Sequence, residues 1–403
     1  MNKSGNVVIA QGGGPTAVTN ASLYGVVRES TRRLSSSSKI WGACGGIAGV
    51  LRERWLDLRR PSERLWKRIA VSPGAALGSC RKMLTAQEAM EAVAVLQRED
   101  VRHFFYIGGN DSMDTALKMC HAASSLNYEM TCCGIPKTID NDLPGTDHCP
   151  GFGSAARFIA QSVVDLGMDI RALPTPVSIL EVMGRDAGWL TAATLLGRKD
   201  PDDAPHLIYV PERPVARRSF LSDVQRIHDR QGWVVAAVSE GIKDETGESW
   251  SANRSFQTVD GFGHKLPGDV AARLAGLVTS ELGLRARSEK PGLLGRSCGL
   301  MASSVDRREA REVGRFGCSW AFKGNTGFMV TIKREGSAAY HVGYGAVPLD
   351  AAANRTRSLP AEYISGDGND IREEYRAYVE PLIGDPLIRY ARLDSSQLPP
   401  AAV

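Results

Sequence analysis

Residues 131–142 read TCCGIPKTIDND, and this stretch decides the fold class. Its first part, Thr131–Ile135, is a short apolar run with the length of a buried strand. Its second part, Pro136–Asp142, is polar and places two carboxylates two residues apart, close to a lysine. A buried strand that opens directly onto a polar loop is typical of an open α/β sheet, where ligands bind at the carboxyl ends of the strands. The stretch therefore predicts a strand followed by a functional loop.

Two earlier segments have the same organisation. Asn6–Ala10 is predicted to be a strand that leads into the glycine-rich turn Gly12–Pro15. Phe104–Ile107 is predicted to be a second strand, and it leads into Gly108–Ser112. Because ligands bind outside the carboxyl ends of such strands, we expect the three polar loops to form one shared site.

Short apolar runs alternate with helical patterns along the rest of the chain, which favours an α/β fold with two Rossmann-like lobes and mainly parallel sheets. Thr85 is predicted to cap a helix that extends to Glu99, with Glu88 completing a capping box. Other helices are expected at 17–34, 113–123, 153–170, 188–196 and 218–231. Further strands are expected at 39–43, 177–182, 207–210 and 233–239. The segment after about 350 is expected to wrap back over the body.

The composition is that of a globular enzyme and argues against several other classes. The 403 residues include 43% hydrophobic and 23% charged residues, and the formal net charge is only +4. So weak a charge gives no support for a nucleic-acid or membrane-surface partner. No apolar run approaches the ~20 residues of a membrane span, and the N-terminus lacks a signal-peptide hydrophobic region, so a cytoplasmic location is expected. The eight cysteines are scattered without a C-x-x-C pair, and we interpret them as reduced thiols.

The two glycine-rich loops suit phosphate binding, although each also has a purely structural interpretation. Glycines after a strand let backbone N–H groups approach an anion, and the helix that follows presents its positive N-terminus. The Gly12–Gly14 turn could equally arise from turn geometry, and it matches neither a Walker loop nor a dinucleotide-binding fingerprint. In the second loop, Asp111 or Ser112 could simply cap the following helix.

The loop Pro136–Asp142 carries the groups that phosphoryl transfer requires. One of its carboxylates can act as a base toward a hydroxyl while the other holds Mg²⁺. A solvated turn rich in Asp and Asn is the structural alternative for the same residues.

As a set, these motifs resemble those of the phosphofructokinase family. Pro136–Asp142 is similar to the family's catalytic signature, and its leading proline and lysine are similar to those of the pyrophosphate-dependent members. The resemblance spans most of the chain in the same order, with further matching segments at Gly12–Pro15, Gly78–Arg81, Gly108–Ser112, Thr146–Ala155, Glu181–Arg185, Ser239–Gly241 and Asn354–Gly368. It implies a Mg²⁺-dependent, readily reversible phosphorylation of fructose 6-phosphate by pyrophosphate, serving glycolysis or gluconeogenesis.

The resemblance also implies which residues act on the metal and on the reacting hydroxyl. Asp140 is expected to be the general base that accepts the proton of the 1-hydroxyl. Asp111 and Asp142 are expected to position Mg²⁺. Asn110 stands where many relatives have a metal-binding aspartate, which leaves its part in the metal site open.

Substrate contacts follow from the same matching segments. Arg81 and Lys137 would hold the donor phosphates and offset the charge on the transferred group. The other expected contacts are Gly13, Thr138, Met183, Gly184, Arg185, Glu240 and Arg296. The family's Gln-Arg-Gly-Gly stretch is not intact, and Leu294–Ser297 is its nearest match. The residues that bind the sugar 6-phosphate are therefore not assigned, and the candidates for this clamp are Arg296, Lys323, Arg355 and Arg357.

Two positions favour pyrophosphate over ATP as donor. In ATP-using relatives the positions of Asp111 and Lys137 are glycines. A carboxylate at Asp111 would fill space and repel an α-phosphate, and Lys137 adds a cation that could grip pyrophosphate. Both replacements point to the same donor.

We expect residues 1–146, with about 296–350, to form the phosphoryl-donor lobe, and residues 147–295, with about 351–403, to form the sugar-phosphate lobe. Family likeness implies a homodimer or a homotetramer. The alternatives are an ATP-dependent phosphofructokinase, a catalytically silent regulatory subunit, and an enzyme for another sugar such as sedoheptulose 7-phosphate. The complete loop Thr138–Asp142 argues against a silent subunit.

Overall fold

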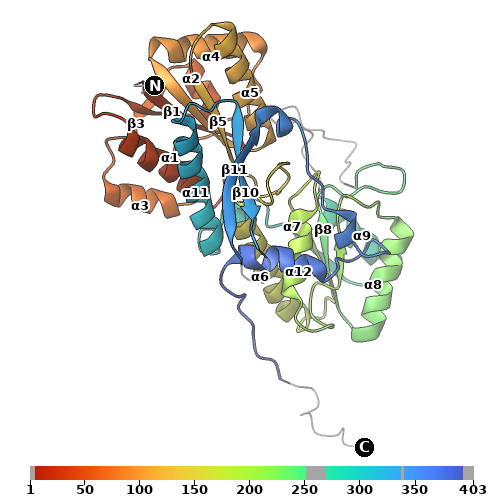
Figure 1. The fold of residues 1–403 in the computed structure, drawn as a ribbon. Coiled ribbons are helices and arrows are strands. Elements are labelled where there is room, and N and C mark those ends of the chain that lie inside the picture. The colour runs from red at the N-terminus through yellow and green to blue at the C-terminus, as the bar shows by residue number, and fades with distance from the viewer. Residues whose placement is uncertain (1–4, 251–268, 337–339, 394–403) are drawn as a thin grey trace, which may run out of the picture.

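The chain folds into two lobes, each built around its own sheet (Figure 1). The structure is a computed structural model, and it describes residues 5–250, 269–336 and 340–393. Within these residues the first sheet has the strand order β11-β10-β5-β4-β1-β2-β3 and the second has the order β7-β8-β6-β9. The prediction of two Rossmann-like lobes with mainly parallel sheets is confirmed.

The first lobe has a parallel sheet with one antiparallel strand at each edge, β3 and β11. Its strands are β1 (Asn6–Gln11), β2 (Ile40–Ala43), β3 (Trp55–Asp57), β4 (Val101–Gly108), β5 (Thr131–Pro136), β10 (Phe328–Arg334) and β11 (Val342–Pro348). Its helices are α1 (Thr19–Arg33), α2 (Gly46–Leu51), α3 (Glu63–Val71), α4 (Ala86–Arg98), α5 (Asn110–Ser125), α11 (Ser304–Ala321) and the 3₁₀ turn η2 (Leu349–Ala351). The predicted capping box of Thr85 and Glu88 begins α4.

The side chains of the central strands alternate between two cores, as the period of two in a strand requires. Val8 and Phe104 belong to the core under α2, α4 and α5. Val7 and Phe105 belong to the opposite core, under α1, α3 and α11. Burial on both faces explains why these strands read as continuous apolar runs in the sequence.

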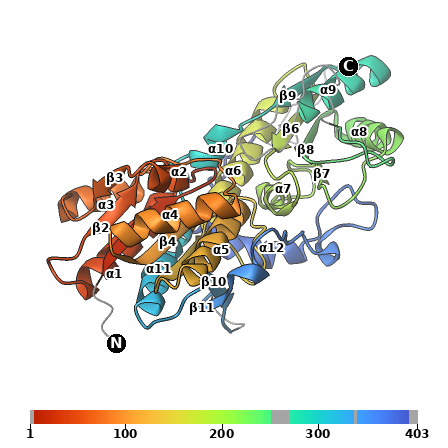
Figure 2. The same cartoon turned by 90° about the horizontal axis from the view of Figure 1, so that it is seen from above.

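The second lobe has a wholly parallel sheet in the described part of the chain. Its strands are β6 (Val177–Val182), β7 (Leu207–Tyr209), β8 (Val234–Ser239) and β9 (Ala286–Glu289). Its helices are α6 (Phe152–Ile170), α7 (Trp189–Ala192), α8 (Arg217–Gln231), α9 (Val270–Leu282), α10 (Leu293–Ser297) and α12 (Glu374–Val379), with 3₁₀ turns η1 (Ala193–Gly197), η3 (Ala361–Tyr363) and η4 (Glu380–Ile383). Figure 2 shows α6 and α10 between the two lobes.

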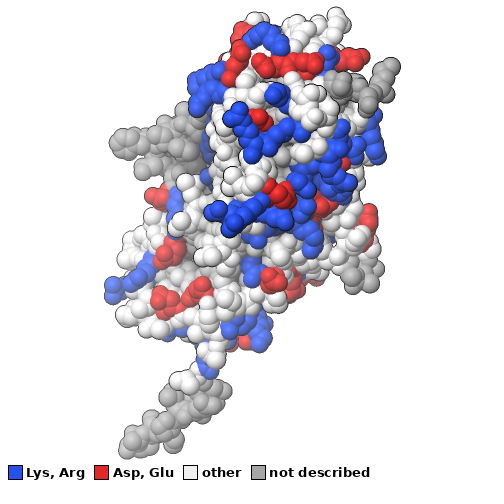
Figure 3. All heavy atoms as spheres, turned by 90° about the vertical axis from the view of Figure 1, so that its left-hand side faces the viewer, with Lys and Arg blue, Asp and Glu red and all other residues white. Residues whose placement is uncertain are grey.

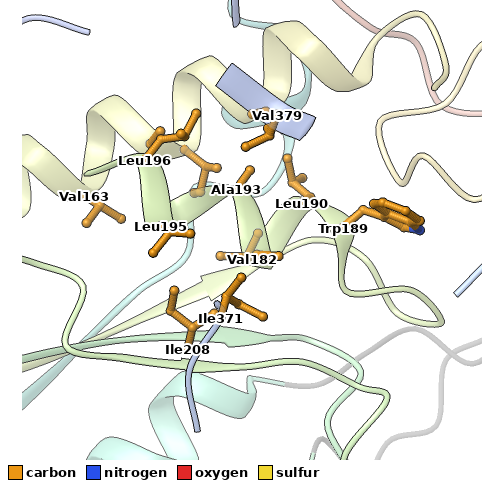
Figure 4. Packing of buried hydrophobic residues seen from close by; sticks show 14 of the residues in the cluster. Val163, Val182, Trp189, Leu190, Ala193, Leu195, Leu196, Ile208, Ile371 and Val379 are labelled. Atoms are coloured by element: carbon orange, nitrogen blue, oxygen red, sulfur yellow. The ribbon is translucent and has the colours of Figure 1, made fainter. Parts of the chain in front are cut away.

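The C-terminal segment wraps back over the second lobe, as expected. Ile371 and Val379 pack with Leu195 and Val163 in one buried cluster (Figure 4). The strands β10 and β11, which precede this segment, belong to the first sheet, so the chain returns to the first lobe before it ends in the second.

One predicted helix differs from the structure. Residues 188–196 were expected to be a single helix, but α7 is a single short turn and the chain continues as the 3₁₀ turn η1. The Thr194 hydroxyl donates to the Thr191 carbonyl oxygen at 2.6 Å, a spacing of three residues that suits the tighter helix. A side chain at Gly197 would come within 2.9 Å of Val163, so α6 packs closely against this turn.

The surface charge is unevenly distributed. Lys and Arg side chains gather on the face of the first lobe that lies to the left in Figure 1 (Figure 3). Arg28 of α1 pairs with Glu63 of α3 at 2.9 Å, and Arg315 pairs with Glu312 within α11 at 2.6 Å. In the described residues, no helix combines the length and apolarity that crossing a membrane requires.

Candidate active site

The loops that follow β1, β4, β5, β6 and β8 line one cleft of about 550 Å³ between the two lobes. Parallel strands bring these loops to the facing edges of the two sheets. Apart from Gly184 and two of the candidates for the 6-phosphate clamp, the predicted site residues line the cleft, among them Gly13, Arg81, Asn110, Asp111, Lys137, Thr138, Asp140, Asp142, Met183, Arg185, Glu240 and Arg296. The expectation that three separated loops form one shared site is therefore met.

Lys137 crosses the end of the cleft that belongs to the first lobe. Its side chain is only 3% exposed, and its ammonium donates to the carbonyl oxygen of Gly14 at 2.6 Å. Burial, together with the nearby Arg296 guanidinium, lowers the pKa of Lys137 to about 8. Gly13 has a φ of +69°, and a Cβ there would lie 3.3 Å from the Lys137 ammonium. The glycine turn and the lysine thus form one closely packed unit.

The loop after β5 presents two carboxylates to the cleft. The Asp140 N–H donates to the Thr138 hydroxyl at 3.0 Å, which folds the loop into a turn. Burial raises the pKa of Asp140, while Lys137 and Arg185 oppose the rise. Burial, together with the nearby Asp140 charge, raises the pKa of Asp142 to about 7. A solvent-exposed turn would leave the pKa values of its aspartates near their ordinary range. The raised pKa values of Asp140 and Asp142 therefore disfavour the interpretation of this loop as a solvated turn.

The loop after β4 begins a helix, but neither of its polar residues caps it. The N-cap of α5 is Gly109, without a side-chain hydrogen bond, and Asp111 and Ser112 lie inside the first turn. Asp111, in this first turn, lines the cleft. The same first turn brings Asn110 to the loop after β5.

The oxygen atoms around Asn110 fit a magnesium ion. The Asn110 amide donates to a carboxylate oxygen of Asp142 at 2.9 Å, while its own Oδ1 is buried without a hydrogen-bond partner. Among the described residues, no group of three or more His, Cys, Asp or Glu side chains is arranged to hold a metal. Mg²⁺ is commonly bound by one or two carboxylates together with substrate phosphates and water. The Asp142 carboxylate and the buried Asn110 Oδ1 beside it are oxygen donors of this kind.

The loops after β6 and β8 interlock at the other end of the cleft. The Gly184 N–H donates to a Glu240 carboxylate oxygen at 3.2 Å, and the Ser239 hydroxyl donates to the Gly184 carbonyl oxygen at 2.7 Å. A Cβ at Gly241 would lie 1.7 Å from the carbonyl oxygen of Arg185, so the two loops touch through their backbones. Burial, together with the Asp140 charge, raises the pKa of Glu240 to about 7. Gly184, though not on the wall, therefore orients Glu240.

The four candidates for the 6-phosphate clamp lie in different places in the structure. Arg296 and Arg355 line the cleft. Lys323 lies after α11, with its ammonium over the Trp320 ring at 5.8 Å, outside the cleft. Arg357 lies behind the cleft wall and contacts backbone carbonyl groups. Arg296 reaches the first lobe, because a Cβ at Gly14 would lie 2.5 Å from its guanidinium.

Sequence reasoning missed several residues of the cleft wall. Asp186 pairs with Arg185 at 2.9 Å and lines the cleft beside it. Leu293 and Thr356 also line the cleft, from α10 and from the C-terminal segment. The position of Asp186 next to a predicted arginine was a usable signal, whereas the other two carry no local pattern.

Comparison with known proteins identifies close relatives. A family model described as phosphofructokinase matches residues 6–320. A relative from Rhodospirillum rubrum named pyrophosphate--fructose 6-phosphate 1-phosphotransferase is 43% identical over 385 residues, which cover 94% of each chain. A relative of the same name from Xanthomonas campestris is 42% identical over 388 residues, covering 94% of this chain and 92% of the relative. A solved structure of a pyrophosphate-dependent phosphofructokinase from Marinobacter aquaeolei matches with a TM-score of 0.84 at 34% identity, covering 99% of this chain and 98% of that one.

Proposed function

The chain belongs to the phosphofructokinase family, and on that premise we propose that it transfers a phosphoryl group from pyrophosphate to D-fructose 6-phosphate. The sugar 1-hydroxyl attacks one phosphorus atom of pyrophosphate, the bridging P–O bond breaks, and inorganic phosphate leaves. The products are fructose 1,6-bisphosphate and phosphate. As the family resemblance implies, the proposed reaction is readily reversible.

The buried ammonium of Lys137 is the observation that carries the choice of donor. It lies between the glycine turn after β1 and the carboxylates after β5, where a donor phosphate would bind. A buried cation at this point attracts a compact tetra-anion such as pyrophosphate. Asp111, at the start of α5, adds a negative charge that opposes an α-phosphate and the nucleoside beyond it.

Asp140 is the proposed general base. It lines the cleft between the donor end and the sugar end, so it can accept the proton of the 1-hydroxyl as the new P–O bond forms. Its raised pKa makes it a stronger base than an exposed aspartate. Arg81, Lys137 and Arg296 would balance the negative charge of the transferred group. Mg²⁺, when bound by Asp142 and Asp111, supplies charge neutralisation and orients the donor phosphates.

The opposite end of the cleft suits a sugar phosphate. Glu240, oriented by the Gly184 N–H, would accept hydrogen bonds from sugar hydroxyls. Met183 provides an apolar wall and Arg185 a cation for the anionic end of the substrate. Thr138 would contact the sugar or phosphate oxygens from the catalytic loop.

The two lobes and the assembly belong to the same proposal. We assign residues 1–146 with about 296–350 to the donor lobe and residues 147–295 with about 351–403 to the sugar lobe. We also expect a homodimer or a homotetramer, which light scattering on the purified protein measures directly.

A coupled assay tests the proposed function. Purified protein, Mg²⁺ and fructose 6-phosphate are mixed with pyrophosphate or with ATP, and the bisphosphate is followed through aldolase and NADH oxidation. We expect turnover with pyrophosphate and not with ATP. Turnover with ATP alone would overturn the donor assignment. Absence of turnover with both donors would favour a regulatory subunit or an enzyme for another sugar. A third reaction with sedoheptulose 7-phosphate distinguishes these two possibilities.

A further inference from the structure

A polar network lies behind the catalytic loop, outside the cleft. Its centre is Arg357, which sequence reasoning treated as a possible ligand for the sugar 6-phosphate. Its neighbours 354–356 line the cleft, but Arg357 does not. Its Nη2 donates to the Asn141 carbonyl oxygen at 2.8 Å, and its Nε donates to the same oxygen at 3.3 Å. Its Nη1 donates to the Asp147 carbonyl oxygen at 2.9 Å.

Three further contacts hold Arg357 in place. Its guanidinium lies 4.2 Å from the centre of the Trp189 ring. The Trp189 indole N–H donates back to the Arg357 carbonyl oxygen at 2.9 Å. Its own backbone N–H donates to the Asp142 carbonyl oxygen at 2.7 Å. Arg357 is therefore bonded to the carbonyl groups of two consecutive residues of the catalytic loop, Asn141 and Asp142.

Asn141 is the residue on which this network acts. It separates the two carboxylates of the loop, is fully buried, and has a φ of +56°, a left-handed conformation that is strained for most residues other than glycine. Its side-chain amide donates to the Tyr378 hydroxyl at 2.7 Å, and its Oδ1 accepts from the Cys149 N–H at 2.9 Å. The Tyr378 hydroxyl in turn donates to the Asp147 carbonyl oxygen at 2.6 Å.

From these contacts we infer that Arg357 and Tyr378 are positioning residues for the transfer reaction. They hold the peptide of Asn141 in its left-handed conformation, and this conformation sets the directions in which Asp140 and Asp142 enter the cleft. Charge-assisted hydrogen bonds to a carbonyl oxygen and stacking on an indole are suited to fixing a loop. The inference rests on the proposed function, because it concerns the carboxylates of that reaction.

The same contacts argue against a phosphate-binding role for Arg357. Its Nε, Nη1 and Nη2 all donate to protein oxygens, and one face of the guanidinium is covered by Trp189. A phosphate at this side chain would have to break the hydrogen bonds that support Asn141. The two roles therefore predict opposite kinetic effects.

The kinetics of Arg357→Lys distinguish them. Lysine keeps the charge but cannot reproduce the fork of the guanidinium or its stacking. We expect kcat with pyrophosphate to fall by about tenfold to a hundredfold, while KM for fructose 6-phosphate changes by less than about threefold, because a small misplacement of the base is costly but the sugar contacts remain. A KM that rises by about tenfold at unchanged kcat would identify a phosphate ligand, and unchanged values of both would exclude any role.

Two additional variants keep the test clear. Tyr378→Phe removes only the hydroxyl and retains the ring, and we expect the same pattern with a smaller loss of kcat. Arg372→Lys is the matched control, because Arg372 is an exposed arginine of the same C-terminal segment, and its kinetics should equal those of the wild type. Calorimetric titration with fructose 6-phosphate reports the folded fraction of each variant through its stoichiometry. An inactive wild type in the same assay would contradict the proposed function rather than this inference.

Discussion

Three charged residues set the chemistry of the cleft at the scale of single side chains. Lys137 and Asp140 lie in one loop, and each perturbs the pKa of the other. Burial favours the neutral form of both, whereas their mutual attraction favours the charged forms. Glu240, at the sugar end, feels the Asp140 charge as well. A cleft that gathers perturbed groups in this manner is typical of an active site.

Replacing Asp140 with asparagine should remove the general base and little else. The amide has the same shape, so substrate contacts should remain, but it cannot accept the hydroxyl proton. We expect kcat with pyrophosphate to fall by about a hundredfold or more with nearly unchanged binding of fructose 6-phosphate. Steady-state kinetics and calorimetric titration measure the two quantities. A variant with near-normal kcat would show that another group takes the proton.

The pKa of Lys137 predicts a pH dependence for pyrophosphate capture. Because the pKa of about 8 lies below that of a free lysine, the ammonium of the free enzyme loses its proton as pH rises through about 8. We expect kcat/KM for pyrophosphate to fall above this pH, since this quantity reports the free enzyme. At saturating pyrophosphate the bound anion favours the ammonium, so kcat/KM for fructose 6-phosphate should lack this alkaline fall. The same fall in both profiles would contradict the assignment.

At the scale of elements, two helices of the first lobe approach each other through glycines. A Cβ at Gly25 of α1 would lie 2.1 Å from the Arg311 carbonyl oxygen of α11, and a Cβ at Gly314 would lie 2.2 Å from the Ser22 carbonyl oxygen. Since backbone atoms cannot move aside as a flexible side chain can, these glycines set the distance between α1 and α11. The two helices together cover one face of the first sheet (Figure 1).

Gly25→Ala should therefore destabilise the fold even though alanine favours helices. We expect a loss of about 1–3 kcal/mol in the free energy of unfolding, as for other overpacked sites. The matched control is Gly276→Ala in α9, where a Cβ would meet nothing within 4 Å. That exposed change should stabilise the protein by about 0.5–1 kcal/mol, because only the helix propensity changes. Urea unfolding of both variants measures the difference, and equal signs would contradict the packing account.

The strands and their loops could be predicted from local sequence, whereas the return of the chain to the first lobe was expected only from the family resemblance. β1, β4 and β5 are buried on both faces, so each reads as an apolar run; β4 ends at Gly108, β5 ends at Pro136, and Gly12 directly follows β1. β10 and β11 join the first sheet from residues beyond 320, and no local pattern identifies their partner strand. Asp140 and Glu240 could be assigned from motifs, but the position of Arg357 depends on a contact with Asn141 across 216 residues.

At the scale of the whole molecule, the cleft between the lobes concentrates buried acids at a cost to stability. The pKa values of Asp142 and Glu240 are each raised to about 7. Such a group binds its proton more tightly in the folded than in the unfolded state. Its contribution to stability is complete below the unfolded pKa near 4 and is lost as pH rises through about 7. At pH 8, where both acids are mostly ionised, their burial should therefore lower the free energy of unfolding of the ligand-free enzyme.

Asp142→Asn should relieve part of this cost. The amide oxygen can still accept the hydrogen bond of Asn110, but the variant carries no buried charge. At pH 8 we expect the ligand-free variant to be more stable than the wild type by about 2 kcal/mol, and the gap should narrow at pH 5 because Asp142 is then largely protonated. Thermal unfolding at the two pH values measures it. A wild type that is more stable than Asp142→Asn at pH 8 would contradict the predicted destabilisation by the buried charge.

The exclusion of ATP is the central claim about the whole cleft, and one comparison tests it most directly. The measurement is the ratio of kcat/KM for pyrophosphate to kcat/KM for ATP, in the wild type and in the double variant Asp111→Gly, Lys137→Gly. We predict a wild type that strongly prefers pyrophosphate and a ratio that falls by about a hundredfold or more in the double variant, equivalent to about 2.7 kcal/mol of lost discrimination. A ratio that is unchanged by the two substitutions, or a wild type that prefers ATP, would contradict the claim.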